Sequence, residues 1–330
     1  MEKIRFGIVG TNFISDWVIT GGLEDERFEP VAVCSRSEQT GQVFAQKYRI
    51  PHVFTSLEAM VASPLIDAVY IASPNAFHAQ QSILCMQHGK HVLCEKAFAS
   101  NAREARRMIE TAHKQGVVLM EAMKPTLTPA FRAVIDWLPQ IGVPRRYFSC
   151  YCQYSSRYDK LKEGIILNAF QPEFSNGATM DIGVYTIYPM VVLFGKPATI
   201  HATGTNLSTG VDGQVAVNFT FHNGIVATAL YGKIADSTLP TEIQGESGTI
   251  KLDRINIIGE AKFINRKGET TTIFPETPHN EYYYEIAEFI DTIQSGKKES
   301  VINSLSNSLI TMEIMDEIRK QLGVRFPADR

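Results

Sequence analysis

Short apolar runs alternate with amphipathic stretches along the first part of the chain. Five runs have the length and composition of buried strands: Ile4–Val9, Pro30–Cys34, Ala68–Ala72, His91–Cys94 and Val117–Glu121. The stretch Ala102–Gln115 has a helical period, and Gly89 and Gly116 follow helical stretches at the positions of C-terminal caps. Strands that alternate with helices predict βαβ units and a doubly wound parallel sheet.

A period of two replaces this pattern after residue 122. Alternating apolar positions predict half-buried strands at two places: Phe148, Cys150, Cys152 and Tyr154, then Val215, Val217, Phe219 and Phe221. The second run meets Asn223-Gly224 and a further apolar run, which predicts a hairpin. Two amphipathic helices are expected at 282–293 and 305–322. We therefore predict an α/β protein with a doubly wound domain over 1–122 and an α+β domain over 123–330, whose large open sheet is mainly antiparallel.

Composition narrows the class of protein. A chain of 330 residues fits two cores, and a net charge of −3 provides no basic field for nucleic acid. The five cysteines are odd in number and lack a C-x-x-C pair, which is typical of reduced thiols. We find no signal-type N-terminus and no apolar run near ~18 residues, so we expect a cytoplasmic protein without a membrane partner. Gly89 separates His88 from His91, and we expect no metal.

The segment after the first expected strand occupies the place of the dinucleotide fingerprint G-x-G-x-x-G. It reads Gly10-Thr11-Asn12-Phe13-Ile14-Ser15 and keeps only the first glycine. We expect Gly10 to make the tight turn, Asn12 to adopt the left-handed backbone of a glycine, and the amides of residues 11 to 14 to bind a pyrophosphate. The alternative is a plain βα turn without a ligand.

The second expected strand ends at Ser35-Arg36-Ser37, where an NAD enzyme places an acidic residue for the ribose 2′-hydroxyl. A guanidinium and hydroxyls can instead bind a 2′-phosphate, so NADP is favoured over NAD. The alternative is a solvated arginine in a loop.

Two more strands end in polar residues at the same sheet edge, where open α/β sheets bind ligands. One ends in Ala72-Ser73-Pro74-Asn75, followed by His78, and the other in Glu95-Lys96. A partly desolvated lysine at this edge can polarise a carbonyl oxygen. The alternative is a lysine that extends to solvent from a strand end.

The segment from Ser175 to Tyr185 is expected to be a loop followed by a helix. Asp181 and Tyr185 are four residues apart and should share a helix face. A phenol near a lysine can exchange a proton with a hydroxyl group. The alternative makes Tyr185 a core aromatic and Asp181 an early-helix charge favoured by the dipole.

These motifs, in this order, resemble the Gfo/Idh/MocA family of oxidoreductases over nearly the whole chain. Tyr185 is similar to the branch that contains dihydrodiol and D-xylose dehydrogenases. The resemblance implies a Rossmann domain, with Lys96 and Tyr185 serving the substrate oxygen, Asp181 binding or orienting the substrate and Asn75 near the nicotinamide. It also implies a homo-oligomer, dimer or tetramer, that associates through the open face of the second sheet.

The family resemblance predicts an NAD(P)-dependent dehydrogenase or reductase for a sugar, polyol or vicinal diol. Lys124 and Asn168 are further candidates for substrate contact. Ala97 stands where the family usually has proline, and Lys124 replaces part of the family's usual substrate wall. A non-catalytic NADP(H) sensor is the alternative from another class, and an NAD-using glycosidase on the same fold is a third possibility.

Overall fold

The computed structural model describes residues 2–330 and divides into two compact units. Unit 1 comprises Met1–Lys124 and Pro278–Ser308, and unit 2 comprises Pro125–Thr277 and Leu309–Arg330. The sequence assigned everything after residue 122 to one domain, whereas the chain returns to unit 1 at Pro278. Ile286, Phe289 and Ile290 of the returning segment are fully buried. Burial of this apolar stripe explains the return.

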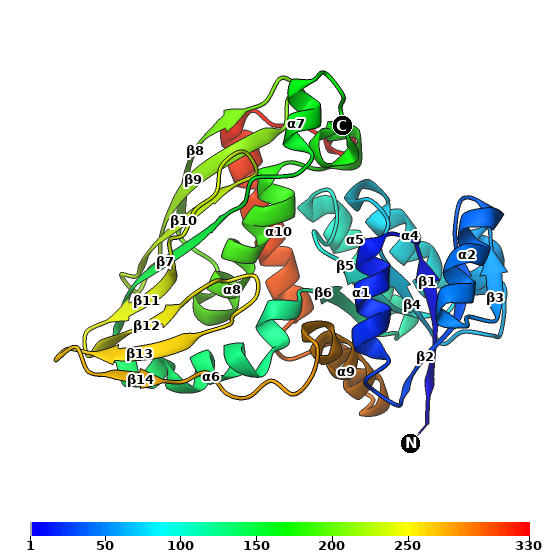
Figure 1. Cartoon of the computed structure of the whole chain (residues 1–330), viewed down its shortest axis with the longest axis horizontal. Helices are drawn as coiled ribbons and strands as arrows, with labels where there is room; N and C mark the ends of the chain where they lie inside the picture. The colour runs from blue at the N-terminus through cyan, green and yellow to red at the C-terminus, as the bar shows by residue number, and fades with distance from the viewer. Residues whose placement is uncertain (1) are drawn as a thin grey trace. The chain divides into compact units, whose positions relative to one another are not determined.

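Six parallel strands form the sheet of unit 1, in the order β3-β2-β1-β4-β5-β6 (Figure 1). They are β1 (Ile4–Val9), β2 (Phe28–Cys34), β3 (His52–Phe54), β4 (Ala68–Ile71), β5 (His91–Glu95) and β6 (Leu119–Ala122). The order reverses between β1 and β4, which creates the switch point of a doubly wound sheet. The predicted doubly wound sheet is confirmed, although three-residue β3 was not foreseen.

The helices of unit 1 are α1 (Phe13–Gly22), α2 (Glu38–Tyr48), α3 (Leu57–Ala62), α4 (Asn75–Gln87), α5 (Ala102–Gln115) and α9 (Glu281–Gln294). Polar side chains accept from the first amides of every one of these helices except α4, which follows Pro74. Helix α5 has the predicted bounds because Asn101 caps its start and Gly116, at φ +66°, ends it. Right-handed crossovers in opposite directions place α1 and α2 on one face of the sheet and α4 and α5 on the other.

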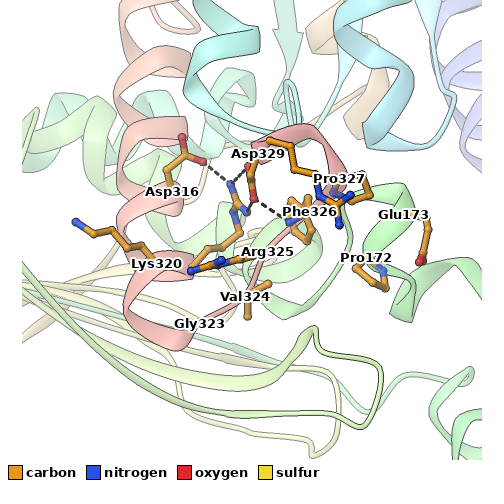
Figure 2. Close-up of a pocket in the computed structure, with 12 residues that line it drawn as sticks. Pro172, Glu173, Asp316, Lys320, Gly323, Val324, Arg325, Phe326, Pro327 and Asp329 are labelled. Carbon is orange, nitrogen blue, oxygen red and sulfur yellow. Dashed lines mark hydrogen bonds and ion pairs between the residues drawn. The ribbon is translucent and has the colours of Figure 1, made fainter.

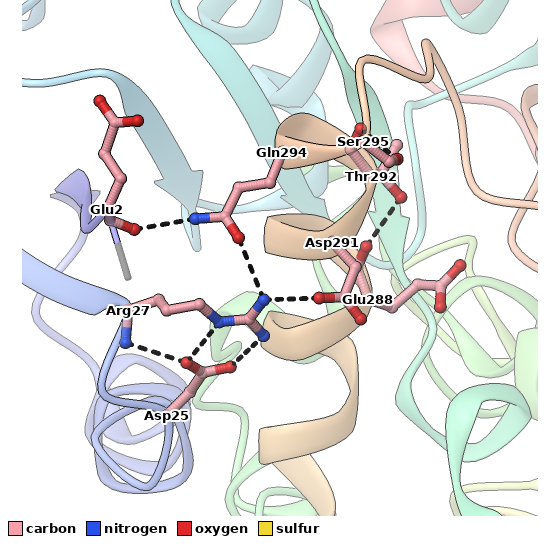
Figure 3. A network of polar contacts seen from close by, with 8 residues as sticks. All are labelled: Glu2, Asp25, Arg27, Glu288, Asp291, Thr292, Gln294 and Ser295. Carbon is pink, nitrogen blue, oxygen red and sulfur yellow. Dashed lines mark hydrogen bonds and ion pairs between the residues drawn. The ribbon is translucent and has the colours of Figure 1, made fainter.

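Helix α9 is fastened to unit 1 by an arginine network (Figure 3). Arg27 binds both oxygens of Asp25 through Nε and Nη2, at 2.9 and 2.6 Å. Its Nη1 reaches Asp291 of α9 at 2.6 Å and Gln294 at 3.2 Å. The Arg27 hydrogen bonds hold the pKa of Asp25 below its usual value. The segment 278–308 is therefore joined to the rest of unit 1 by polar contacts as well as apolar packing.

Unit 2 is built on an eight-stranded sheet of order β14-β13-β12-β11-β7-β10-β9-β8 (Figure 1). The strands are β7 (Pro144–Cys152), β8 (Thr199–Asn206), β9 (Asp212–Thr220), β10 (Val226–Gly232), β11 (Thr241–Gly245), β12 (Gly248–Leu252), β13 (Ala261–Asn265) and β14 (Thr270–Thr272). Among the described strands of this sheet, only β7 and β10 pair in parallel. The mainly antiparallel sheet is confirmed, and so is the hairpin, since Thr220 pairs with Val226 across the Asn223-Gly224 turn.

The larger helices of unit 2 lie along one face of this sheet (Figure 1). They are α6 (Pro129–Trp137), α8 (Val184–Phe194) and α10 (Leu305–Leu322), with a π-helix at Thr179–Gly183 before α8; the first residues of α10, up to Ser308, belong to unit 1. The short α7 (Tyr158–Lys162) follows β7. The alternation predicted in β7 is present, but the more buried face is the opposite one. Tyr147 and Ser149 are fully buried: Tyr147 donates a hydrogen bond to the Thr186 carbonyl of α8 at 3.0 Å, and the Ser149 hydroxyl lies 3.1 Å from that of Thr241. Phe148 is only half-buried.

One stretch among the described residues, Pro172–Phe194, is long and apolar enough to cross a membrane by length and composition. The sequence analysis had found no such run. In the structure, 72% of its apolar window is buried inside unit 2, as in the core helix of a folded domain. The stretch is therefore weak evidence for a membrane span.

A cavity of about 730 Å³ lies in unit 2 beside the end of α10 and the C-terminal segment (Figure 2). Arg319 pairs there with Asp316 at 2.7 Å and Asp329 at 2.8 Å. None of the residues that line this cavity belongs to the site predicted from the sequence.

Candidate active site

The turn after β1 is as tight as the fingerprint requires, but Asn12 is not the glycine substitute we expected. Gly10 has φ +103°, and a Cβ there would lie 3.1 Å from the Ala72 carbonyl oxygen. Asn12 has φ −92° and caps α1: its Oδ1 accepts from the Ile14 amide at 2.8 Å, while its Nδ2 donates to the Ala72 carbonyl at 2.7 Å. The left-handed backbone predicted for Asn12 is therefore wrong, and the Ile14 amide already has an acceptor.

The segment after β2 places its three polar residues at the start of α2. Ser35 is buried and its hydroxyl lies 3.1 Å from that of Thr40, whereas Arg36 is exposed. Ser37 caps α2 by accepting from the Thr40 amide at 3.4 Å. An exposed guanidinium beside a helix N-terminus is suited to a phosphate group.

His78 joins two of the predicted segments rather than facing a ligand. Ser73 and Pro74 precede α4, and Asn75 begins it. The ring of His78 is fully buried, with Nδ1 2.8 Å from the Ala97 carbonyl oxygen and Nε2 2.7 Å from that of Ser73. Burial lowers its pKa. His78 has no exposed atom to offer a cofactor and instead holds the turn after β4 against the segment after β5.

Glu95 and Lys96 end β5 as predicted, and their environments differ. Glu95 is buried and accepts a hydrogen bond from the hydroxyl of Tyr70 on β4 at 2.5 Å. Lys96 is half-buried, and the peptide bond that joins it to Ala97 is cis. Burial raises the pKa of Glu95, while the Tyr70 hydrogen bond and the Lys96 charge oppose that shift. Lys96 thus lies at the carboxyl edge of the sheet beside a buried carboxyl group.

Two further buried carboxyl groups in unit 1 were not predicted. Glu121 on β6 accepts from the Phe98 amide at 3.1 Å, and burial raises its pKa to about 8. Glu285 on α9 is fully buried, and within the described residues neither of its oxygens has a hydrogen-bond partner. Burial raises the pKa of Glu285 well above its usual value, and the charge of Glu95 adds to this effect. At neutral pH, Glu121 is therefore expected to be mostly protonated.

We expect Glu121→Gln to reduce the dependence of stability on pH. The pKa of Glu121 is raised in the folded chain, so its stabilising effect is complete below pH ~4.5 and is lost as the pH rises to about 8. Each pKa unit between these two values corresponds to about 1.4 kcal/mol of the free energy of unfolding. In thermal melts from pH 5 to 8, the melting temperature of the variant should increase relative to that of the wild type as the pH increases. Parallel curves for the two proteins would contradict the prediction.

The ammonium of Lys124 already interacts with two side chains of unit 1. It forms an ion pair with Glu281 and lies 4.3 Å from the ring centroid of Tyr282. The side chain is almost fully buried. Substrate contact by Lys124 stays a prediction, and these contacts do not favour it.

In unit 2, Asp181 lies within the π-helix and Tyr185 in the first turn of α8. The fully buried Asp212 holds this segment, because its Oδ2 accepts from the amide and hydroxyl of Thr179 at 2.6 and 2.7 Å. Both candidate side chains are half-buried. The ring of Tyr185 contacts that of Tyr151 on β7 edge-on, at 5.7 Å between centroids.

Asp181 forms an ion pair that the sequence analysis missed. The ammonium of Lys233, which directly follows β10, lies 2.6 Å from Asp181 Oδ2. A lysine after a buried strand was the signal that identified Lys96, and Tyr231-Gly232-Lys233 carries the same signal. Asn168 is exposed, and its carbonyl accepts from the Asn176 amide group at 3.0 Å.

No group of three or more His, Cys, Asp or Glu residues within 2–330 is arranged to hold a metal ion. The candidate chemistry therefore depends on two sets of groups: Lys96 with its carboxyl neighbours in unit 1, and Asp181, Tyr185 and Lys233 in unit 2.

Comparison with known proteins finds a family match in each of the two units. Residues 4–123 match an oxidoreductase family with an NAD-binding Rossmann fold, and residues 141–251 match the GFO/IDH/MocA C-terminal domain. The chain is 49% identical to scyllo-inositol 2-dehydrogenase (NADP(+)) IolU of Bacillus subtilis (strain 168), over 99% of each chain. It is 29% identical to trans-1,2-dihydrobenzene-1,2-diol dehydrogenase of Mus musculus, also over 99% of each chain.

Solved structures show the same fold at lower identity. Levoglucosan dehydrogenase in complex with NADH and L-sorbose superposes with a TM-score of 0.86 at 18% identity, covering 98% of this chain and 97% of that chain. The family matches span both units, and the relatives align from end to end. The chain therefore belongs to the Gfo/Idh/MocA family of oxidoreductases.

Proposed function

We propose that this protein is an NADP-dependent dehydrogenase or reductase of a polyol, sugar or vicinal diol. The observation that carries the proposal is the half-buried Lys96 at the carboxyl edge of a Rossmann sheet, in a chain 49% identical to an NADP-dependent inositol dehydrogenase. The diol dehydrogenase relative extends the substrate class to adjacent hydroxyl groups.

The residues of unit 1 fit the cofactor. The close approach of Gly10 to Ala72 leaves the start of α1 facing the sheet edge, where the amides of Thr11, Asn12 and Phe13 are suited to a pyrophosphate. Ser35 and Arg36 would hold the 2′-phosphate of NADP, and Asn75 and Glu95 would lie near the nicotinamide half. Bound nicotinamide supplies or accepts the hydride.

The chain's own groups handle the substrate oxygen. In the oxidative direction, Tyr185 Oη takes the proton of the reacting hydroxyl, and the ammonium of Lys96 stabilises negative charge on that oxygen. Asp181, held by Lys233, accepts a hydrogen bond from a substrate hydroxyl. In the reductive direction, Tyr185 returns the proton.

The cofactor choice is tested by titrating NADPH and NADH into wild type and Arg36→Ala, following nicotinamide fluorescence. Loss of one charge-assisted contact to a phosphate should weaken NADPH binding about tenfold to a hundredfold and leave NADH binding unchanged. Equal weakening of both nucleotides would rule out 2′-phosphate recognition by Arg36. If neither NADPH nor NADH binds to the wild type, the dehydrogenase proposal is wrong.

The turnover assay follows NADPH formation from NADP⁺ and scyllo-inositol, the compound named for the Bacillus relative. If scyllo-inositol is not oxidised, other inositols, sugars and vicinal diols are tested as substrates in the same assay. Nucleotide binding without turnover of any of them would favour the non-catalytic sensor.

Association and location complete the proposal. The face of the unit 2 sheet opposite α8 carries half-buried apolar residues, including Phe148 and Leu230. This supports a homo-oligomer, dimer or tetramer, that associates through the sheet. The reduced state expected of the five cysteines supports a cytoplasmic location.

A further inference from the structure

Lys233 is a buried cation that lies directly behind a candidate substrate residue. Its side chain is only 2% exposed, while that of its partner Asp181 is 35% exposed. The Lys233 ammonium also donates to the Ala169 carbonyl at 3.3 Å and lies 4.9 Å from the ring centroid of Phe170. The ion pair therefore has one end in the core of unit 2 and the other at its surface.

The backbone fixes Lys233 in this position. Its amide donates to the Gly213 carbonyl at 2.8 Å, and its carbonyl accepts from the Ser155 amide at 2.9 Å. These bonds tie the residue to β9 on one side and to the segment after β7 on the other. The Lys233 side chain thus starts from a backbone that neighbouring strands hold on both sides.

Asp181 is the main counter-charge of Lys233. The charge of Lys233 also acts on Asp212, which is fully buried and bound to Thr179. Burial raises the pKa of Asp212 and so disfavours its charged form, although its hydrogen bonds and Lys233 oppose the shift. Asp181 is half-exposed and lies closer to the ammonium, at 2.6 Å.

Stability alone is a poor explanation for this pair. Taking a charge out of water costs several kcal/mol, and a buried ion pair is often no more stabilising than well-packed apolar side chains. A methionine would fill the space of Lys233 without that cost. The pair does something that an apolar side chain cannot do, since the Lys233 ammonium holds the Asp181 carboxyl group in one orientation.

We propose that Lys233 is a positioning residue for the reaction, which holds the Asp181 carboxylate in place to receive a substrate hydroxyl. This inference rests on the proposed function. It predicts that Lys233 influences catalysis only through Asp181 and has no effect on the nucleotide.

A double-mutant cycle tests the inference in the polyol assay with the full-length protein. Lys233→Met should lower kcat/KM by about tenfold to a hundredfold, mainly by raising KM, because the carboxylate loses a charge-assisted contact. The same change made on Asp181→Asn should lower kcat/KM by no more than about twofold. NADPH affinity should be unchanged in every variant. A purely structural role would give the same loss in both backgrounds and would overturn the proposal.

Two further variants keep the test decisive. Lys196→Met is the matched control, since Lys196 forms a 2.6 Å ion pair with Glu313 on the surface of unit 2, and its kcat/KM should match the wild type. If Lys233→Met does not fold, Lys233→Arg replaces it, because the bulkier planar guanidinium changes the geometry at Asp181. The same non-additivity with Asp181→Asn is then expected, and additive losses would again overturn the proposal.

The failure of this inference differs from that of the proposed function. If Asp181→Asn leaves kcat/KM unchanged, the role of Asp181 in the proposed function is wrong. If Asp181→Asn lowers kcat/KM but Lys233→Met does not, the proposed function stands and the inference about Lys233 is wrong.

Discussion

Replacing Tyr185 with phenylalanine should lower kcat by about 10² to 10⁴, the range for removal of a general acid–base group. The change deletes one oxygen and leaves the ring free to pack against Tyr151, so folding and nucleotide affinity should be preserved. The measurement is steady-state NADPH formation together with a thermal melt and an NADPH titration. A loss of kcat at constant melting temperature identifies the hydroxyl as the reacting group.

Tyr151→Phe is the matched control for this prediction. Its hydroxyl donates to Gln153 at 3.0 Å in an exposed position, and its ring contacts the same aromatic partner. We expect its kcat to stay within about threefold of the wild type, well below the effect of a general acid–base group. A comparable loss of kcat in both variants would mean that the aromatic pair acts by packing, and Tyr185 would no longer be the proton-exchanging group.

Replacing Lys96 with methionine should lower kcat by a similar factor, about 10² to 10⁴. The methionine keeps much of the length of the side chain and removes the charge that would stabilise the substrate oxygen. Single-turnover measurements at saturating NADP⁺ would separate the chemical step from binding. The hydride-transfer rate should fall, whereas the amplitude of NADPH binding should not.

Lys90→Met is a control at the other end of the same strand. Lys90 donates to the Ser63 and Ile66 carbonyls at 3.1 and 2.8 Å, just before β5 begins. Its loss should lower the melting temperature and leave the activity of the folded fraction unchanged. Full activity of Lys96→Met would exclude Lys96 from the chemistry and shift attention to the unit 2 groups.

Periodicity was sufficient to predict the two sheets and the strands that end at the ligand edge. The strands that end at the ligand edge are mainly apolar, and the polar residues expected there lie at or just after the strand ends, with Glu95 as the last residue of β5 and Lys96 directly after it. Lys96 could be found in this way because its position depends only on where β5 ends. The bounds of α5 could also be predicted, because the residues that cap its two ends are identified in the local sequence.

The errors have local physical causes. Asn12 was expected to copy a glycine backbone, but its carboxamide gains two hydrogen bonds in the extended conformation of a helix cap. In β7, apolar residues mark the less buried face, because Ser149 is buried through a hydroxyl contact with Thr241 at 3.1 Å. A prediction from hydrophobicity alone does not identify a polar side chain that is buried because it has a hydrogen-bond partner.

The missed residues depend on long-range pairing. Lys233 meets Asp181 across 52 positions of sequence, and this proximity requires β10 to lie beside β7 and under the π-helix. Glu285 joins the carboxyl groups of unit 1 only because α9 returns to that unit. A single sequence marks Lys233 as a lysine after a buried strand, but it contains no signal that this lysine meets Asp181 or that Glu285 reaches unit 1.

The return of the chain to unit 1 limits how this protein can be dissected genetically. A fragment ending at residue 122 would lack α9 and leave Phe6 without Phe289, its ring neighbour at 5.9 Å. It would also leave Arg27 without Asp291. A soluble nucleotide-binding fragment would have to splice 278–308 onto 1–124 through a designed linker. Likewise, homologous exchange of one unit between relatives requires three crossover points rather than one, at 124/125, 277/278 and 308/309.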